Sequence, residues 1–294
     1  MALTNRNLAT AMSDSVSEAA ANLAVAFLGP TGTFSHEAAS RCAGETMSLQ
    51  PVASIDDVFL AVEAGNAELG VVPVENSTEG AVNTTQDCLV ETSLRTIAEL
   101  YLPIQHNFLV NPVAEPGQIR RIVSHKQSLG QCRLWLREHF PAIECQDVAS
   151  NAEAARMAAS DPDTAAIAGE LAASTYQLKI LHAGIQDRKN NTTRFLVLSR
   201  DGKTSSTGCD KTSILVYAEN KPGALFRILA PFDKYQVSLT RIETRPARDG
   251  VWSYVFFIDF EGHMDDPAVR QVFSELTQCT VKIKNLGSYP RAIG

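Results

Sequence analysis

An alternation of short apolar runs with amphipathic segments, between residues 25 and 199, is the feature that most constrains how this chain can fold. The segments between the runs have helical periodicity, as in 54–65, 129–140 and 151–160. Strands separated by helices predict βαβ units and a largely parallel sheet, so this part belongs to the α/β class. The predicted strands are VAFLG (25–29), LGVVPVE (69–75), HNFLV (106–110), RIVSH (121–125), AAIAG (165–169) and RFLVLS (194–199).

A polar segment, DGKTSSTGCD (201–210), follows these strands, and its Gly, Ser and Thr residues indicate a linker. Beyond it the predicted elements follow the order βαββαβ, which is typical of ferredoxin-like domains. We therefore predict an N-terminal extension (1–23), a first domain (24–200), the linker and a small second domain (211–294). The six segments of the second domain are 212–219, 221–235, 238–247, 251–262, 267–278 and 280–290.

Composition and charge exclude several classes of protein. Hydrophobic residues make up 45% of the 294 and charged residues 20%, as in ordinary globular proteins. The net charge of −7 argues against a broad nucleic-acid surface, so an anionic substrate needs a local site. No apolar stretch approaches the roughly 20 residues of a membrane span. The start of the chain lacks the apolar region of a secretory signal, so we expect a cytoplasmic protein.

Cysteine and histidine spacing gives no sign of a metal centre. None of the six cysteines forms a CxxC pair, and the six histidines show no HExxH spacing. The cysteines are typical of small reduced residues in a cytosolic protein. We therefore expect no metal centre.

Three predicted strand-to-helix turns are rich in hydrogen-bonding side chains. They are GPTGTFSHEAAS (29–40), VPVENSTEGAV (72–82) and SHKQSLGQC (124–132). Free N–H groups and the helix dipole make such termini anion sites, and in a parallel sheet they gather at one edge. The alternative is that these residues only cap helices, where Ser, Thr and Asn are preferred anyway.

The segment NNTTRF (190–195) adds a fourth polar cluster, at the mouth of the strand RFLVLS. Together with the three turns it favours a ligand that carries carboxylates. The planar guanidinium of Arg194 suits a bidentate carboxylate contact, although a surface salt bridge at the start of a strand is the alternative.

These motifs, in this order and spacing, resemble prephenate dehydratase. KPGALFRIL and LTRIETRP in the second domain resemble the regulatory ACT domain of that family, and NLGSYPRA resembles its usual ending. The resemblance covers about residues 24–290. Lys126 and Ser128 stand where the family commonly has Pro and Ala. In the second domain Ser238 replaces the usual Asn, and Thr244 makes ETRP from ESRP.

The resemblance implies two α/β lobes, similar to type II periplasmic binding proteins, with an active site in the cleft between them. It implies conversion of prephenate to phenylpyruvate, water and CO2 without a cofactor. It also implies feedback inhibition by phenylalanine bound at an ACT dimer interface, in a homodimer or homotetramer. The bifunctional members carry a helical chorismate mutase domain in front, for which 23 residues are too few, so we expect the monofunctional form.

The resemblance marks Thr193 as the catalytic hydroxyl. The chemistry points to the same residue, since loss of hydroxide from prephenate needs a hydrogen-bond donor at the departing oxygen. Ser77 and Asn76 are second choices for this donor, and Glu75 lies beside them. Phe195 could face the substrate ring or simply pack in the core. The implied substrate-binding residues are Arg194, Phe195, Thr31, Thr33, Gln127, Ser128 and Asn191, and the implied effector-binding residues are Gly223, Ala224, Leu225, Phe226, Ser238, Glu243, Thr244 and Arg245.

Two alternatives to this function remain open at this stage. One is a cytosolic amino-acid-binding sensor with the same two-lobed fold, because a fold does not determine a function. A sensor would not need the hydroxyl of Thr193 next to Arg194. The other is arogenate dehydratase, which performs the same chemistry on the amino-acid analogue of prephenate, and no single residue separates the two.

Overall fold

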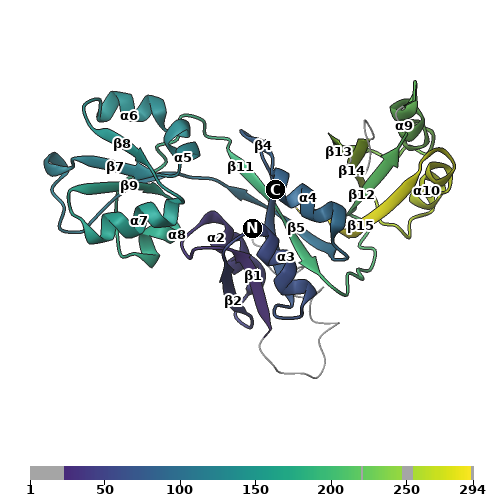
Figure 1. The fold of residues 1–294 in the computed structure, drawn as a ribbon, viewed down its shortest axis with the longest axis horizontal. Coiled ribbons are helices and arrows are strands. Elements are labelled where there is room, and N and C mark those ends of the chain that lie inside the picture. Colours follow the sequence, from purple (N-terminus) through teal and green to yellow (C-terminus); the bar gives the residue numbers. More distant parts are fainter. Residues whose placement is uncertain (1–22, 220, 247–253, 293–294) are drawn as a thin grey trace. The chain divides into compact units, whose positions relative to one another are not determined.

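The computed structural model describes residues 23–219, 221–246 and 254–292 (Figure 1). The predicted N-terminal extension therefore lies outside the described residues, apart from Leu23. Two compact units make up the described chain. One contains residues 23–86 and 101–195, and the other contains residues 87–100 and 196–292. The predicted domain boundaries differ from this division and stay a prediction.

A sheet with strand order β2-β1-β3-β11-β5 forms the first lobe. Strands β1 and β2, and β1 and β3, pair in parallel, as the βαβ pattern predicts. A two-residue strand, β4, pairs with β3 as a hairpin. The strands are β1 (Ala24–Leu28), β2 (Ser48–Val52), β3 (Leu69–Asn76), β4 (Gly80–Ala81), β5 (Arg95–Pro103) and β11 (Thr192–Ser199), and the helices are α2 (Phe34–Ala43), α3 (Ile55–Glu63) and α4 (Asn83–Glu91).

The second lobe contains a five-stranded sheet of order β10-β6-β9-β7-β8. Its strands and helices are β6 (Asn107–Val110), β7 (Arg121–Ser124), β8 (Glu144–Asp147), β9 (Thr164–Ala168), β10 (Lys179–His182), α5 (Lys126–Gln131), α6 (Arg133–His139), α7 (Asn151–Ser160), α8 (Glu170–Thr175) and the short 3-10 helix η1 (Pro116–Gln118). Strand β7 pairs in parallel with β8 and β9, but β6 is antiparallel to β9 and β10. The prediction of a largely parallel sheet is therefore wrong for this lobe.

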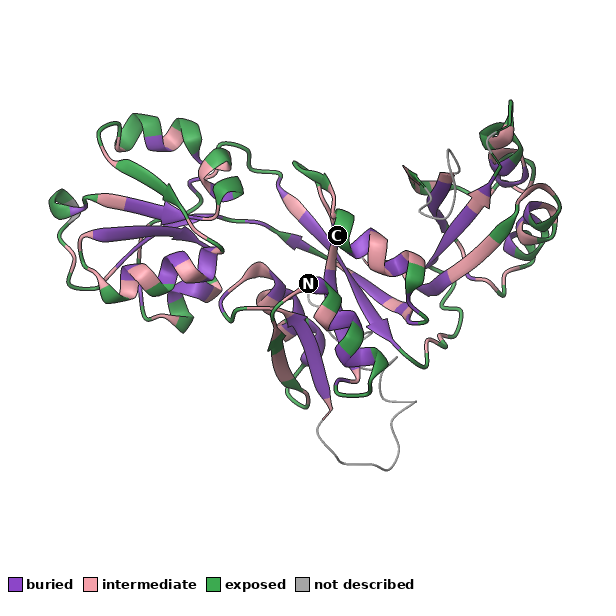
Figure 2. Cartoon of the chain, in the orientation of Figure 1, coloured by how far each residue is buried: buried purple, intermediate pink, exposed green. Residues whose placement is uncertain are grey.

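Alternating side chains of this sheet pack into two separate buried clusters. Figure 2 shows strands β7 and β9 as mainly buried. Leu109, Val123 and Ala166 pack with the alanines of α7 and α8. Their neighbours Phe108 and Ile122 face the other way and pack with Leu136 and Cys132 around α5 and α6. Burial on both faces explains why these strands are continuous apolar runs in the sequence.

The second predicted domain is a four-stranded antiparallel sheet of order β13-β14-β12-β15. Its elements are β12 (Asp210–Ala218), α9 (Ala224–Lys234), β13 (Leu239–Pro246), β14 (Tyr254–Glu261), α10 (Pro267–Cys279) and β15 (Lys282–Pro290), which confirms the βαββαβ prediction. Both helices cover one face, since Phe232 of α9 and Leu276 of α10 share a core with Ile214, Ile258 and Phe260.

The opposite face of this sheet holds a buried ion pair. Lys211 Nζ lies 2.7 Å from Glu99 Oε1 of β5, and the two side chains are 5% and 0% exposed. Nearby, Lys284 of β15 donates to the carbonyls of Leu89 and Val90 at the end of α4, at 2.9 and 2.8 Å. A cation at the carboxyl end of a helix is favoured by the helix dipole. These contacts join the sheet to β5 and α4 within the same compact unit.

Several elements differ from the sequence prediction for identifiable reasons. Strands β2 and β8 were missed because they contain few buried side chains, and every residue of β8 is exposed. The predicted helix 129–140 is two short helices that meet at Cys132. The turn 72–82 does not open a helix at once, because a β3–β4 hairpin precedes α4. Among the described residues, no helix is long and apolar enough to cross a membrane.

Candidate active site

The side chains of Asn76 and Thr193 meet at the ends of two strands, β3 and β11. Asn76 Nδ2 lies 2.8 Å from Thr193 Oγ1 and 2.9 Å from Asn191 Oδ1. Backbone bonds hold the two segments together, since Ser77 N donates to Thr192 O at 2.9 Å. The structure therefore brings together four residues that the sequence proposed from distant motifs, namely Asn76, Ser77, Asn191 and Thr193.

The orientation of the Asn76 amide is set by the turn that follows it. Its Oδ1 accepts from the backbone N–H groups of Thr78 and Glu79, at 2.9 and 3.1 Å. Its Nδ2 must then be the group that faces Thr193 and donates to Oγ1. Because Thr193 Oγ1 accepts this bond, its own proton remains available for another acceptor. Thr193 is 8% exposed, so this proton is shielded from bulk water.

The Ser77 hydroxyl forms hydrogen bonds with the backbone of segment 190–192 rather than facing an open site. Its hydroxyl accepts from Thr192 N at 2.9 Å and lies 3.2 Å from Asn190 O. Glu75 is half-buried on β3 next to Asn76, and adjacent strand residues point to opposite faces. The catalytic roles predicted for Ser77 and Glu75 stay predictions.

The second lobe contributes Gln131, a residue that the sequence analysis missed. Gln131 Oε1 accepts from Asn191 Nδ2 at 2.8 Å, and Gln131 Nε2 lies 3.4 Å from Glu79 Oε1. The sequence predicts Gln127 and Ser128 of the same motif instead. Gln127 is exposed, and Ser128 is buried in a bond with Asn151 of α7. One helical turn separates Gln127 from Gln131, so sequence spacing could not distinguish them.

The GPTGTFS turn is mainly a helix cap. Thr33 Oγ1 accepts from His36 N at 3.2 Å at the start of α2, and it lies 3.0 Å from Pro30 O. Thr31 is exposed and, with Pro30 and Pro51, lines a shallow pocket on the first lobe. Substrate contacts by Thr31 and Thr33 stay predictions, as do those by Gln127 and Ser128.

Arg194 and Phe195 are 5% and 1% exposed. Alternation along β11 puts the side chain of Arg194 on the opposite face from Thr193 and puts Phe195 on the same face. The burial of Phe195 agrees with the simpler alternative of core packing. Carboxylate binding by Arg194 and ring contact by Phe195 stay predictions.

The two lobes approach each other closely at two glycines near this network. A Cβ added to Gly169, before α8, would lie 2.9 Å from the ring of Phe34 on α2. Gly32 has a φ of +88°, and an added Cβ would lie 3.1 Å from the Tyr176 ring. The hydroxyl of Tyr176 also donates to Thr31 O at 3.2 Å. A side chain at either place would require the facing ring to shift, and the positive φ of Gly32 also favours glycine there.

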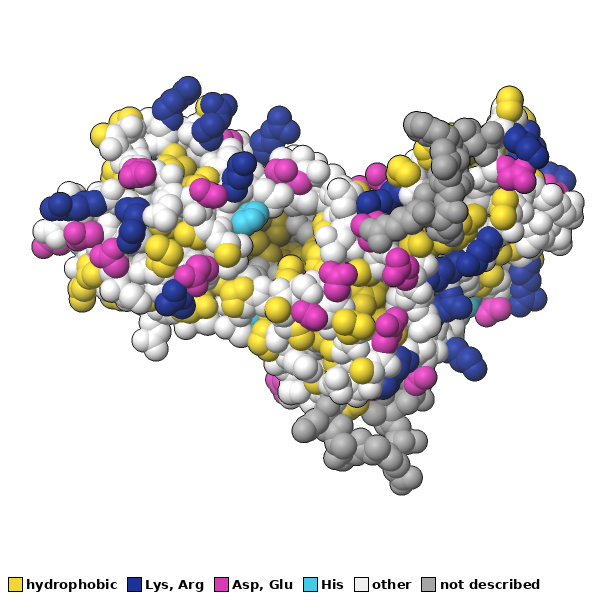
Figure 3. Space-filling view, viewed as in Figure 1, with side chains coloured by type: hydrophobic (Ala, Val, Ile, Leu, Met, Phe, Trp, Pro, Cys, Tyr) yellow, Lys and Arg dark blue, Asp and Glu magenta, His cyan; other side chains and the backbone are white. Residues whose placement is uncertain are grey.

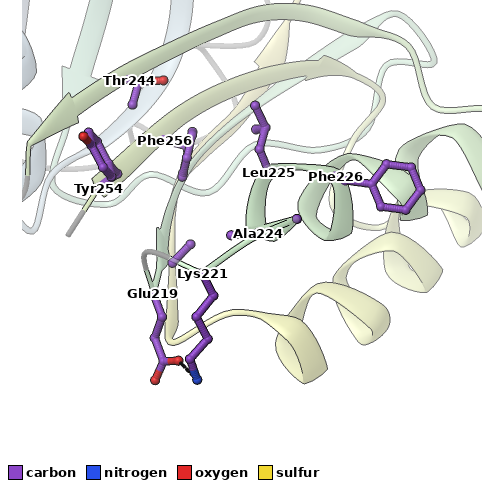
Figure 4. Close-up of a pocket in the computed structure, with 10 residues that line it drawn as sticks. Glu219, Lys221, Ala224, Leu225, Phe226, Thr244, Tyr254 and Phe256 are labelled. Atoms are coloured by element: carbon purple, nitrogen blue, oxygen red, sulfur yellow. Dashed lines mark ion pairs between the residues drawn. The ribbon is translucent and has the colours of Figure 1, made fainter. Parts of the chain in front are cut away.

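A separate pocket of about 340 Å³ lies in the βαββαβ domain, at the start of α9 (Figure 4). Gly223 begins the helix with a φ of 75°, and Glu219 pairs with Lys221 at the rim. Leu225 and Phe226 are 41% and 74% exposed. The lining residues are Ala218, Glu219, Lys221, Gly223, Ala224, Leu225, Phe226, Thr244, Tyr254 and Phe256.

Three of the predicted effector residues are not among those that line this pocket, namely Ser238, Glu243 and Arg245. Arg245 instead pairs with Asp87 of α4 at 2.9 Å. The effector roles of all eight predicted residues stay predictions.

Among the described residues, no three His, Cys, Asp or Glu side chains are grouped as a metal site would require. On the face seen in Figure 3, basic and acidic side chains are interspersed rather than gathered by sign.

A two-lobed α/β core with a buried hydroxyl in an amide network, followed by a βαββαβ domain with its own pocket, defines an enzyme core joined to an ACT-type regulatory domain. The family model described as prephenate dehydratase matches residues 25–203, and the ACT domain model matches residues 212–277. The chain belongs to the prephenate dehydratase family, which confirms the resemblance noted in the sequence.

Relatives of this chain cover nearly its whole length. It is 50% identical over 271 residues to a bifunctional chorismate mutase/prephenate dehydratase of Pseudomonas aeruginosa, covering 92% of this chain and 74% of the relative. A prephenate dehydratase structure from Arthrobacter aurescens, in complex with L-Phe, is 36% identical with a TM-score of 0.84, covering 92% and 90%. The structure of GqqA, described as a novel type of quorum quenching acylase, is 28% identical with a TM-score of 0.82, covering 91% of this chain and 97% of that structure.

Proposed function

We propose that this protein converts prephenate to phenylpyruvate, water and CO2, and that phenylalanine inhibits it. The observation that carries the proposal is the bond from Asn76 Nδ2 to Thr193 Oγ1. It leaves the Thr193 proton free to point at a leaving oxygen, which is the arrangement that a dehydratase needs. The membership of the chain in the prephenate dehydratase family supports the same reaction.

The chemistry requires little more than a held substrate and a proton donor. The bond between the ring and its carboxylate breaks, and its electron pair enters the ring. The carbon–oxygen bond at the opposite ring carbon breaks as the ring becomes aromatic, and the departing hydroxide takes up one proton to leave as water. Thr193 supplies a hydrogen bond to that oxygen, and the dianion plus one proton gives phenylpyruvate anion, CO2 and water.

The polarity of this network disfavours acyl transfer through Thr193. A nucleophilic hydroxyl needs a neighbouring base that accepts its proton. The neighbour here is the donor Nδ2 of Asn76. Purified protein should therefore be incubated separately with prephenate and with arogenate, and the products separated by chromatography. We expect phenylpyruvate from prephenate; folded protein that forms none would refute the proposal, and phenylalanine from arogenate would indicate the alternative substrate.

Asn76→Asp is expected to lower kcat by about 100-fold, the cost of removing one positioned donor. A carboxylate at this position accepts the Thr193 proton and turns it away from the substrate. Asn66→Asp makes the same change on an exposed turn after α3 and serves as the control. Steady-state kinetics of both variants decides the point, and equal kcat values would show that the Asn76 amide does not orient Thr193.

Phenylalanine is expected to bind the pocket at the start of α9, where N–H groups in the first turn of the helix can donate to its carboxylate. Calorimetry should detect binding at millimolar phenylalanine or below, and a bound substrate analogue should weaken it by reciprocity. Ala224→Leu fills the pocket floor and should weaken binding at least about 10-fold. Binding that leaves turnover unaffected would make this a structural domain rather than a regulatory one.

The proposal includes a cytoplasmic homodimer or homotetramer. Strand β13 is an edge of its sheet, with side chains alternately half-buried and exposed, and the outer backbone groups of an edge strand can pair with another chain. Light scattering of the purified protein, with and without phenylalanine, measures the oligomeric state.

A further inference from the structure

His106 is a buried histidine that the reaction described above does not use. It immediately precedes β6 in the second lobe and is 2% exposed. Its backbone is held on both sides, since His106 N donates to Gln186 Oε1 at 3.0 Å and His106 O accepts from Ile185 N at 2.8 Å. The ring meets Phe34 of the first lobe edge-on, with centroids 5.6 Å apart.

The ring nitrogens of His106 differ sharply in their surroundings. Nε2 lies 2.8 Å from Gln131 Oε1. Nδ1 is buried and, within the part of the chain that the structure describes, has no hydrogen-bond partner. Burial lowers the pKa of His106, so the ring is neutral at neutral pH and carries a proton on only one nitrogen.

A chain of hydrogen bonds runs from Asn76 through Asn191 and Gln131 to His106, and the donor of each bond is determined by its neighbours. Asn76 Oδ1 accepts two backbone N–H groups, so Asn76 Nδ2 donates to Asn191 Oδ1. Asn191 Nδ2 then donates to Gln131 Oε1, while Gln131 Nε2 faces the carboxylate of Glu79. Gln131 Oε1 is therefore an acceptor, and His106 Nε2 must donate to it.

We propose that His106 is a positioning residue for Thr193, held as the Nε2–H tautomer. This tautomer keeps Gln131 Oε1 as the acceptor for Asn191 Nδ2, so that Asn191 Oδ1 is turned toward Asn76 Nδ2, the group that donates to the Thr193 hydroxyl. The inference rests on the proposed dehydratase function. If Nε2 carried no proton, Gln131 would have to turn its amide nitrogen toward His106. That flip would remove the acceptor for Asn191 and bring Gln131 Oε1 against Glu79.

A purely structural role for His106 makes different predictions. Loss of a core histidine should lower stability and leave the kinetic constants of the folded fraction unchanged. Loss of a positioning residue should lower kcat more than it changes KM, because the geometry of the donor matters most in the transition state. Gln places its Nε2 donor near the position of the histidine Nε2, so it should rescue a positioning role.

Two substitutions at His106 test the kinetic part. His106→Leu is expected to lower kcat about 10- to 100-fold with KM within about 3-fold, the scale seen when groups that orient a site are removed. His106→Gln should retain kcat within about 3-fold. Equal kcat for His106→Leu and wild type, or equal losses in both variants, would overturn the proposal. Circular dichroism confirms that the protein compared is folded.

Two further measurements keep the proposal testable if His106→Leu does not fold. Gln131→Met, at a half-exposed position, breaks the same chain and should lower kcat to a similar extent. Nuclear magnetic resonance of 15N-labelled histidine reads the tautomer directly, and the expected pattern is a protonated Nε2 with an unprotonated Nδ1. The opposite tautomer would refute the inference, whereas inactive wild-type protein with the expected tautomer would refute only the dehydratase proposal.

Discussion

Thr193→Val is expected to lower kcat by about 10²–10⁴-fold, with a smaller change in KM. Valine keeps the branched shape at a site that is 8% exposed, so the effect reports the hydroxyl rather than the packing. The physical reason is that the Thr193 proton is the one left uncommitted when Oγ1 accepts from Asn76 Nδ2 at 2.8 Å. Initial rates of phenylpyruvate formation from prephenate measure it.

Thr193→Ser is the matched control, since it restores a hydroxyl at the same position. We expect it to recover most of the lost kcat, although serine rotates more freely than threonine. Correctly folded Thr193→Val protein with near-normal turnover would remove this residue from the mechanism. The donor at the departing oxygen would then have to be sought elsewhere in the network.

Lys211→Met is expected to lower the free energy of unfolding by about 3–5 kcal/mol, because it leaves the buried carboxylate of Glu99 without its cation. Glu99 is fully buried, and both of its oxygens lie within 2.9 Å of Lys211 Nζ. Urea unfolding monitored by circular dichroism measures the change. Lys234→Met removes an exposed pair with Glu275 and should leave the midpoint almost unchanged.

The double variant Lys211→Met with Glu99→Leu separates two explanations for that loss. If the cost comes from an uncompensated buried charge, replacing both partners with apolar side chains should recover much of the stability. If the double variant is as unstable as the single one, the stability comes from the specific hydrogen bonds of the pair. These include the bond from Ala292 N to Glu99 Oε1 at 3.3 Å.

The polar cluster of the site could be anticipated from the sequence because strand ends are visible in it. Asn76 and Ser77 end one apolar run, while Asn191 and Thr193 precede another, and strands of one sheet place such ends together. Gln131 and His106 could not be anticipated. Their roles depend on the approach of the second lobe to the first, which no periodicity records.

The sequence by itself determined the α/β class and the βαββαβ order, because buried strands need apolar runs and specific turns need specific residues. Its motifs carried the resemblance that implied the family and the two lobes. Only the tertiary structure decided the antiparallel pairing of β6, the β3–β4 hairpin and the exposed edge strand β8. It also decided which way each amide points from Asn76 to His106. The reason is physical: a strand's direction and the orientations of the Asn191 and Gln131 amides are set by partners distant in the chain, and hydrogen bonds with those partners exist only after folding.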